Sequence, residues 1–342
     1  MRYVGADVHK NYTVFCVLAQ DGEIEAEGRV ENTPEAMSAF LDEVPRPAQL
    51  AVEASYHWQP FYELVEQMDL EVFLAHPYKV RLIAESRIKT DTIDARALAH
   101  LLRLDYLPTA YIPPRKVRDL REVLRHRAKL VRTRTQLKNR VHGILAKNGI
   151  RHPWTDLFGK GGRAFLEELE LRAPYQLALR QDLAVVDTLN EQIRELDVII
   201  EEKAERSPEA MLLTTMPGIG YYSALLILSE IGDIKRFPTP QKLCSWAGLV
   251  HSTYSSGGRT YHGHLTKQGS RWLRWILTQA ATPGIRGSPS FRAFRDRVAR
   301  RAGGNAAKMA LARKMLIIIH RMLWRGEPFQ ENYGSPAIPC RS

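Results

Sequence analysis

The order of secondary-structure signals in the first third of the chain constrains its fold more than any other feature. Three β-rich runs come first, separated by the turn segments "HKN" and "QDG", and they are typical of a meander. Helical and β-rich segments then alternate, and Thr33 is the expected N-cap of the first helix. The pattern predicts a mixed sheet with helices on its faces. The strands are expected at residues 2–7, 12–19, 23–30, 48–53 and 71–76, and the helices at residues 34–44, 58–68, 77–87 and 91–103.

This βββαβαβα order is the one that an RNase H-like α/β fold requires. After "YIPP" at residues 111–114 the pattern changes to long helices, so the fold class predicted for the whole chain is α/β plus all-α. An apolar residue recurs every seven positions through the first long helix, and a second apolar stripe follows at residues 175–206. These two helical stretches pair either with each other or with another copy of the chain.

The last third of the chain is expected to be mainly helical. A "PGIG" turn at residues 217–220 separates two helical runs, a helix-hairpin-helix-like pattern whose backbone N–H groups can hold a phosphate; a tight turn between packed helices is the alternative. A helix, a polar Gly-rich loop at residues 250–270 and basic helices to about Trp324 should follow. The 342 residues therefore divide into an RNase H-like domain (1–110), a helical coiled-coil region (111–208), a helical C-terminal domain (209–326) and a tail (327–342).

The charge distribution favours a nucleic-acid partner. The net charge is +11, and residues 115–147 hold twelve Lys or Arg against two acidic residues, whereas residues 251–325 hold fifteen against one. One basic run is often no more than a solvated helix face, but two zones this one-sided favour a polyanion.

The cysteines and the N-terminus predict a soluble cytoplasmic protein with no membrane partner. Cys16, Cys244 and Cys340 follow no zinc or disulfide spacing, as expected of thiols in a reducing compartment. The N-terminus lacks the apolar core of a signal peptide, and no run of eighteen apolar residues is present.

Four carboxylates are placed where the predicted fold would bring them together. Asp7 ends the first strand, Glu53 ends the strand expected beside it, and Asp91 and Asp94 lie at positions i and i+3 of one helix, on the same face. Each alone has a structural explanation, since acids are common at strand ends and in first helical turns. Together they would repel one another unless a cation is present. Converging oxygen ligands suit Mg²⁺, so the sequence predicts a metal site.

The segments "GADVHK", "VEAS", "KTDTIDARALA", "MPGIG" and "SSGG...GHLTKQGSRWLR" together resemble the DEDD insertion-sequence transposases, whose N-terminal domain is similar to the RuvC Holliday-junction resolvase. The resemblance covers about residues 2–325 in the family's order. It implies that Asp7, Glu53, Asp91 and Asp94 are the catalytic Mg²⁺ ligands, with Mn²⁺ as a substitute, and that residues 209–326 form the transposase domain. Lys89 and Arg96 become candidate phosphate or carboxylate neighbours, and Glu85 is interpreted as a surface residue.

The resemblance also implies a nucleophilic serine in the C-terminal domain. From the residues alone, a serine before glycine is most often a turn. The family's Ser-Gly matches Ser256 and Gly257, so Ser256 is the expected nucleophile and Ser255 the alternative. The sequence shows no separate base to activate it. The active site is therefore expected to be shared, with the acids from one subunit and the serine from another. The nearby cations that would neutralise phosphate charge are Arg259, Lys267, Arg271 and Arg274.

Three functions remain open at this point. The leading one is a DNA recombinase that acts on donor and target DNA as a dimer or tetramer; the resemblance implies guidance by a structured bridge RNA, for which composition gives no sign of its own. The second is a RuvC-like, structure-selective, Mg²⁺-dependent endonuclease with water as the nucleophile. The third is a non-enzymatic nucleic-acid-binding protein in which the acids only cap helices.

Overall fold

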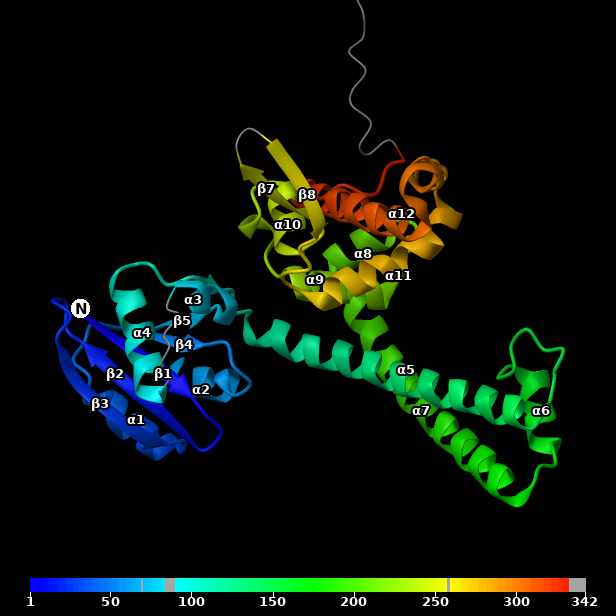
Figure 1. Ribbon diagram of the computed structural model, residues 1–342, viewed down its shortest axis with the longest axis horizontal. Coiled ribbons are helices and arrows are strands. Elements are labelled where there is room, and N and C mark those ends of the chain that lie inside the picture. Colours follow the sequence, from blue (N-terminus) through cyan, green and yellow to red (C-terminus); the bar gives the residue numbers. More distant parts are fainter. Residues whose placement is uncertain (69, 84–89, 257–258, 332–342) are drawn as a thin grey trace, which may run out of the picture. The chain divides into compact units, whose positions relative to one another are not determined.

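The computed structural model describes residues 1–68, 70–83, 90–256 and 259–331. The chain folds into two compact units, Met1–Pro113 and Pro114–Ser342, each with its own core (Figure 1). The helices expected over residues 111–208 and over residues 209–326 belong to the same unit. The boundary expected after residue 110 lies after residue 113.

A six-stranded mixed sheet in the order β3-β2-β1-β4-β5-β6 forms the centre of the first unit. The first three strands are an antiparallel meander, and β4 and β5 run parallel to β1, which confirms the predicted RNase H-like arrangement. The sequence did not predict β6, because two residues carry no periodicity. The strands are β1 (Arg2–Val8), β2 (Tyr12–Leu18), β3 (Ile24–Glu31), β4 (Ala48–Glu53), β5 (Glu71–Ala75) and β6 (Thr109–Ala110).

Helices cover both faces of this sheet. Leu41 of α1 and Phe61 of α2 pack with Phe15 on one face, whereas Ala95 and Ala99 of α4 pack on the other. Thr33 caps α1 as predicted, since its Oγ1 accepts a hydrogen bond from the Ala36 backbone at 3.3 Å. The helix expected at residues 77–87 is described only as far as residue 83. The helices are α1 (Pro34–Asp42), α2 (Trp58–Val65), α3 (Pro77–Ile83) and α4 (Asp91–Arg103).

Two long antiparallel helices, α5 and α7, open the second unit (Figure 1). Arg127 contacts Asp197 at 2.8 Å and Arg140 contacts the buried Asp182 at 2.6 Å, so the partners run in opposite directions along the two helices. The predicted apolar stripe of α7 is buried in this unit. Of the two pairings left open by the sequence, the one within a single chain is therefore present. The helices are α5 (Arg115–Lys147), α6 (Lys160–Glu168) and α7 (Ala173–Glu205).

The "PGIG" segment is a packing turn. Gly218 has φ +92°, and a Cβ on it would lie 2.3 Å from the Ala280 carbonyl oxygen of α11, so glycine is required there. The Gly220 N–H donates to Ser223 Oγ at 2.8 Å and does not face an open anion site. The predicted pair of helical runs on either side of this turn is confirmed, and its geometry favours the alternative of a tight turn between packed helices. The helices concerned are α8 (Pro208–Thr214), α9 (Tyr221–Ile231) and α11 (Arg271–Gly287).

The segment predicted as a Gly-rich loop is a β-hairpin, so that prediction was wrong. Two β-prone runs, "HSTYSS" and "RTYHGHL", flank the dipeptide Gly-Gly, which is a hairpin signal. Its two strands pair antiparallel, with Tyr254 opposite Tyr261. The elements around it are η1 (Ile234–Arg236), α10 (Pro240–Trp246), β7 (His251–Ser256) and β8 (Arg259–Leu265).

The last helix, α12 (Pro289–Arg325), contains a sharp bend at Gly303, whose φ is +80°. This left-handed conformation favours glycine and interrupts the regular helix. The tail from residue 332 onward lies outside the described residues.

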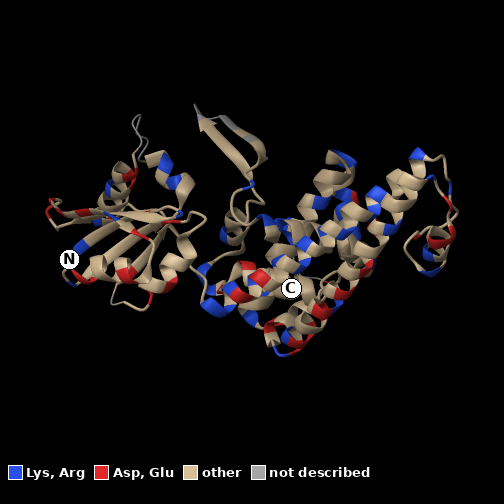
Figure 2. Ribbon diagram, turned by 90° about the horizontal axis from the view of Figure 1, so that it is seen from below, with Lys and Arg blue, Asp and Glu red and all other residues tan. Residues whose placement is uncertain are grey.

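Basic side chains are numerous along the second unit, as Figure 2 shows in blue. The two basic zones of the sequence correspond to α5 and to the hairpin with α11 and α12. Among the described residues, no helix is both long and apolar enough to cross a bilayer.

Candidate metal centre and serine hairpin

The ends of β1 and β4 place two predicted ligands side by side. The parallel register pairs Ala6 with Val52, so the next residues, Asp7 and Glu53, are adjacent across the sheet. Neighbouring strands lie about 4.8 Å apart. The predicted adjacency of these two strands is therefore confirmed, and Glu53 comes next to Asp7 through the backbone register alone.

Helix α4 brings the other two acids to the same face. Gly5 precedes Asp7 by two residues and so shares its face of the strand. A Cβ on Gly5 would lie 1.9 Å from the Ala95 carbonyl oxygen, which shows that α4 packs directly on the backbone of β1. The helix starts at Asp91 because Thr90 Oγ1 accepts the Ile93 N–H at 3.3 Å. Asp91 and Asp94 thus lie in the first turn, over the end of β1.

His9 joins Asp7 to Asp91. Its Nε2 lies 3.0 Å from Asp7 Oδ2 and 3.3 Å from Asp91 Oδ2. The Tyr12 hydroxyl donates to the same Asp91 oxygen at 2.9 Å, and the Arg29 guanidinium lies 3.6 Å from the centre of the Tyr12 ring. The sequence interpretation missed His9 and Tyr12. The available signal was spacing, since His9 is two residues beyond Asp7 at the strand end.

The electrostatics of this cluster favour a bound cation. Burial raises the pKa of Asp7, and the neighbouring His9 opposes that rise, while the charges of Asp94 and Asp91 add to it. The hydrogen bond to Asp91 is the main reason that the pKa of Tyr12 is raised. Ionised Asp7 is therefore disfavoured in the absence of a cation.

A divalent cation fits the donor set. Ligand atoms of Asp7, His9 and Asp91 all lie within 4.8 Å of one another. Carboxylate oxygens suit Mg²⁺ and Mn²⁺, and an imidazole nitrogen is accepted more readily by Mn²⁺. The structure thus brings Asp7 and Asp91 together directly, Asp94 acts on Asp7 through its charge, and Glu53 is adjacent by register.

Arg96, one of the two cationic neighbours predicted for these acids, has another partner. Arg96 forms a two-pronged ion pair with Glu27 of β3, with Nη2 2.6 Å from Oε2, and this pair lowers the pKa of Glu27. Arg96 therefore anchors α4 to the edge strand. Lys89 and Glu85 lie outside the described residues. An open groove of about 550 Å³ reaches Asp91 between Glu27, Arg29 and Thr92.

The predicted nucleophile lies at the tip of the β7–β8 hairpin. Ser256 is the last residue of β7 and pairs with Arg259, and Ser255 pairs with Thr260. Gly257 and the side chains of Ser256 and Arg259 lie outside the described residues.

The other predicted phosphate contacts follow the hairpin. Lys267 is exposed and has φ +53°, and the exposed Arg271 is the first residue of α11. Arg274 is held differently, because its Nη1 donates to the carbonyl oxygens of Ala247 and Gln268 at 2.9 and 2.6 Å. Arg274 therefore stabilises the backbone between the β7–β8 hairpin and α11.

Two transposase family profiles match this chain, and the first of them covers the first unit together with α5. Residues 4–148 match a family profile described as "Transposase" and named for DEDD proteins of the IS110 type, and residues 210–296 match "Transposase IS116/IS110/IS902 family". The transposase of insertion element IS1111A from Coxiella burnetii is 25% identical over 343 residues, covering 96% of this chain and 92% of the relative. The transposase of IS1328 from Yersinia enterocolitica is 29% identical over 248 residues, covering 72% and 73%. A probable family 20 transposase from Pseudomonas aeruginosa is 28% identical over 272 residues, covering 72% and 78%.

Proposed function

The chain belongs to the IS116/IS110/IS902 family of transposases, and on that premise we propose that it recombines the DNA of its own mobile element with a Mg²⁺ site and a serine nucleophile. The observation that carries the proposal is the convergence of Asp7, His9 and Asp91 beneath the first turn of α4. In the third function considered above, the acids only cap helices, which gives no reason for Asp7 to be buried against like charge.

Asp7, Glu53, Asp91 and Asp94 would hold the cation, and His9 is close enough to contribute. When bound, Mg²⁺ supplies electrostatic stabilisation of charge on the phosphoryl oxygens. The carboxylates fix its position because they come from a strand end and a capped helix, both held by the core of the first unit.

Ser256 would attack a DNA phosphorus atom through its hydroxyl oxygen. One phosphate ester bond to a deoxyribose oxygen breaks as the new bond to serine forms; the hydroxyl proton leaves, and the departing oxygen takes up a proton. One phosphodiester is exchanged for another, so rejoining needs no ATP. Arg259, Lys267 and Arg271 would neutralise phosphate charge around the serine.

The serine is tested by its covalent product. Ser256→Ala should abolish the denaturation-resistant protein–DNA adduct while DNA binding stays near that of the wild type, and Ser255→Ala should still form the adduct. An adduct that persists in Ser256→Ala and disappears in Ser255→Ala would move the assignment by one residue. Mg²⁺-dependent cleavage without any adduct would favour the resolvase-type endonuclease with water as the nucleophile.

We further propose that the acids and the serine of one active site come from different subunits of a dimer or tetramer. Neither Asp7→Asn nor Ser256→Ala should form the adduct alone. When the two are mixed, acids from the Ser256→Ala subunit can serve the intact serine of the Asp7→Asn subunit, so the adduct should appear on the Asp7→Asn chain only. A mixture that forms no adduct would show that both parts come from one subunit, provided that mixed oligomers are demonstrated by differential tags.

A structured guide RNA is the partner that we propose for choosing the DNA sites. The twelve Lys and Arg residues of α5 suit a phosphate backbone, which carries no sequence information. Base pairing would then supply sequence choice. Recombination between donor and target plasmids, with and without the RNA encoded beside the gene, tests this directly. Equal recombination without that RNA would overturn it.

A further inference from the structure

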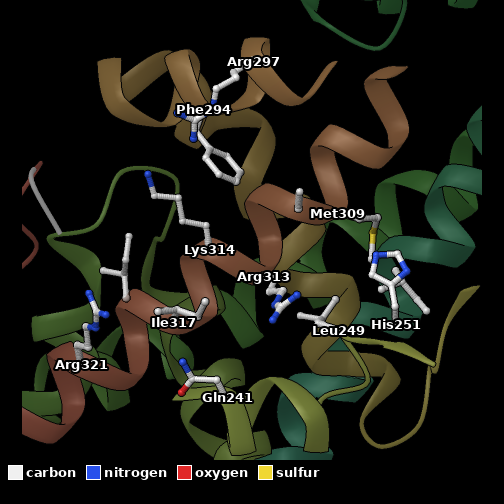
Figure 3. A pocket seen from close by; sticks show the side chains of 13 residues that line it. Gln241, Leu249, His251, Phe294, Arg297, Met309, Arg313, Lys314, Ile317 and Arg321 are labelled. Atoms are coloured by element: carbon white, nitrogen blue, oxygen red, sulfur yellow. The ribbon is translucent and has the colours of Figure 1, made fainter. Parts of the chain in front are cut away.

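A cationic cavity of about 460 Å³ lies in the second unit at the foot of the β7–β8 hairpin (Figure 3). His251 and Leu265, at the base of the hairpin, form part of its wall together with α10 and α12. The proposed function gives this cavity no role.

The bend in α12 creates the cavity. Phe294 and Lys314 are twenty residues apart and would lie about 30 Å apart on a straight helix. Instead, the Lys314 Nζ is 4.8 Å from the centre of the Phe294 ring. The bend at Gly303 therefore folds the helix back, so that the residues on either side face each other across the cavity.

The lining is strongly positive. It includes Arg297, Arg313, Lys314 and Arg321, and the described lining residues include no carboxylate. Burial, together with the charge of Arg297, lowers the pKa of Lys314. The charge of Glu331 acts on Lys314 in the opposite direction, but Glu331 Oε2 already accepts hydrogen bonds from Ser288 Oγ and the Ser290 N–H at 3.0 and 3.2 Å. An anion in the cavity would relieve this charge excess.

The cavity also offers an aromatic surface beside its cations. The Arg297 guanidinium is 5.5 Å from the centre of the Phe294 ring, on which Lys314 also lies (Figure 3). An aromatic ring flanked by cations is the composition of sites for unpaired nucleotides, in which the base stacks and the phosphates pair with the cations.

The hairpin links this cavity to the proposed nucleophile. His251 begins β7 and Ser256 ends it, and five residues of strand span about 17 Å. Between them, Tyr254 and Tyr261 form a cross-strand pair whose exposed fractions are 68% and 61%. Stacked nucleotides advance about 3.4 Å each, so 17 Å corresponds to roughly five nucleotides.

We propose that the cavity binds an unpaired nucleotide of the DNA strand that Ser256 attacks, about five nucleotides from the attacked phosphate. The base lies against Phe294, and its phosphates pair with Arg297, Lys314 and Arg321. The assignment to the attacked strand rests on the proposed function, whereas the nucleotide chemistry rests on the cavity itself.

Equilibrium binding of labelled single-stranded DNA and RNA of the same sequence tests the proposal. The full chain is used without divalent cations, so that binding is measured in the absence of cleavage. Phe294→Leu should weaken DNA binding by roughly five- to 150-fold, the range for loss of one base-stacking partner. Arg297→Gln with Lys314→Gln should lower the slope of log affinity against log salt by about 0.7 for each cation removed.

The matched control is Arg300→Gln, an exposed arginine of α12 outside the lining, which should leave the affinity within about twofold of the wild type. Thermal unfolding of each variant checks that the unit is folded. Normal DNA binding by folded Phe294→Leu and Arg297→Gln/Lys314→Gln would overturn the proposal. Weakened RNA binding with unchanged DNA binding would overturn the choice of DNA.

Position along the strand is tested by photocrosslinking. DNA carrying 5-iododeoxyuridine at successive positions should crosslink best to the cavity when the analogue lies about five nucleotides from the phosphate joined to Ser256. Crosslinking centred elsewhere would overturn that distance. If DNA binds in the cavity but no serine adduct forms, the proposed nucleophile is wrong and the proposed nucleotide site is retained.

Discussion

Replacing Gly5 with alanine should separate the two halves of the metal centre. The added Cβ would lie 1.9 Å from the Ala95 carbonyl oxygen and 2.7 Å from the Ala99 nitrogen, both in the backbone of α4. Backbone atoms cannot rotate away, so the helix must retreat by at least about 1.1 Å for the first contact to reach 3.0 Å. Asp91 moves with it, away from His9 and Asp7. Metal ligands tolerate errors of only about 0.2 Å, so metal binding should be weakened.

Gly5→Ala should lower both the stability of the first unit and its affinity for Mn²⁺. Overpacking typically costs about 1–3 kcal/mol, and the rigid neighbour places Gly5→Ala near the top of that range. Reduced chain entropy in the unfolded state returns roughly 0.5–1 kcal/mol, which leaves about 2 kcal/mol of destabilisation. For a unit of this size that corresponds to a drop in Tm of roughly 8 °C. Mn²⁺ affinity should fall about 10- to 100-fold, as when the support of a metal ligand is disturbed.

Calorimetry with Mn²⁺ and thermal unfolding of the full chain measure the two effects. Gly28→Ala is the matched control, since its Cβ would meet only the Phe40 ring, at 3.0 Å, on the other face of the sheet. It should leave Mn²⁺ binding intact. If Gly5→Ala keeps both its Tm and its Mn²⁺ affinity, close packing of α4 on β1 is not what positions Asp91 and Asp94.

Three further predictions concern single sites, and the second has a matched control variant. Gly143→Ala, on the exposed side of α5 with nothing within 4 Å of its Cβ, should raise the free energy of unfolding by about 0.5–1 kcal/mol in a denaturant titration. Glu230→Ala should lower it by about 2–3 kcal/mol, because it leaves Arg125 and Ser270 without the buried carboxylate that now contacts them at 2.7 and 2.8 Å; Glu202→Ala, in an exposed pair with Arg206, should change it by less than about 0.5 kcal/mol. Asp7→Asn should raise the Tm of the metal-free protein at neutral pH and abolish the increase caused by Mg²⁺. The pKa of Asp7 is raised in the folded state, so its stabilising contribution is complete below 3.8 and is lost as the pH rises through the folded value; the advantage of the variant should therefore vanish in acid.

The strand order and the acidic residues could be predicted because each depends on local sequence. β-rich and apolar runs separated by turns or helices identified β1 to β5, and strand ends located Asp7 and Glu53 before any contact was known. The start of α4 at Asp91 was likewise predicted, which fixes where Asp91 and Asp94 lie, and Thr90 caps it. The RNase H-like connectivity then determined which strand ends become neighbours.

Features that depend on distant contacts could not be predicted in this way. His9 looks like an ordinary turn residue until α4 places Asp91 3.3 Å from its ring. Arg274 looked like a phosphate ligand, but the fold surrounds its Nη1 with carbonyl oxygens from residues up to twenty-seven positions away. The bend at Gly303 could not be predicted either, because a glycine in a helical pattern does not show whether the helix continues. The hairpin was missed despite a local signal, since polar strands flanking Gly-Gly were interpreted as a loop.

The acids of the metal centre lie next to a buried core, whereas the serines of the hairpin do not. Asp7 follows Gly5, Val4 and Ala6, which are buried in the first unit, so substitutions around the acids change both folding and metal binding. In the β7–β8 hairpin, by contrast, none of the residues whose side chains are described is buried. Substitutions at Ser255 and Ser256 should therefore leave the second unit as stable as the wild type. Loss of the adduct in a Ser256 variant can then be interpreted as lost chemistry, whereas loss of activity in a variant of β1 or α4 requires a separate measurement of folding before it is assigned to the metal.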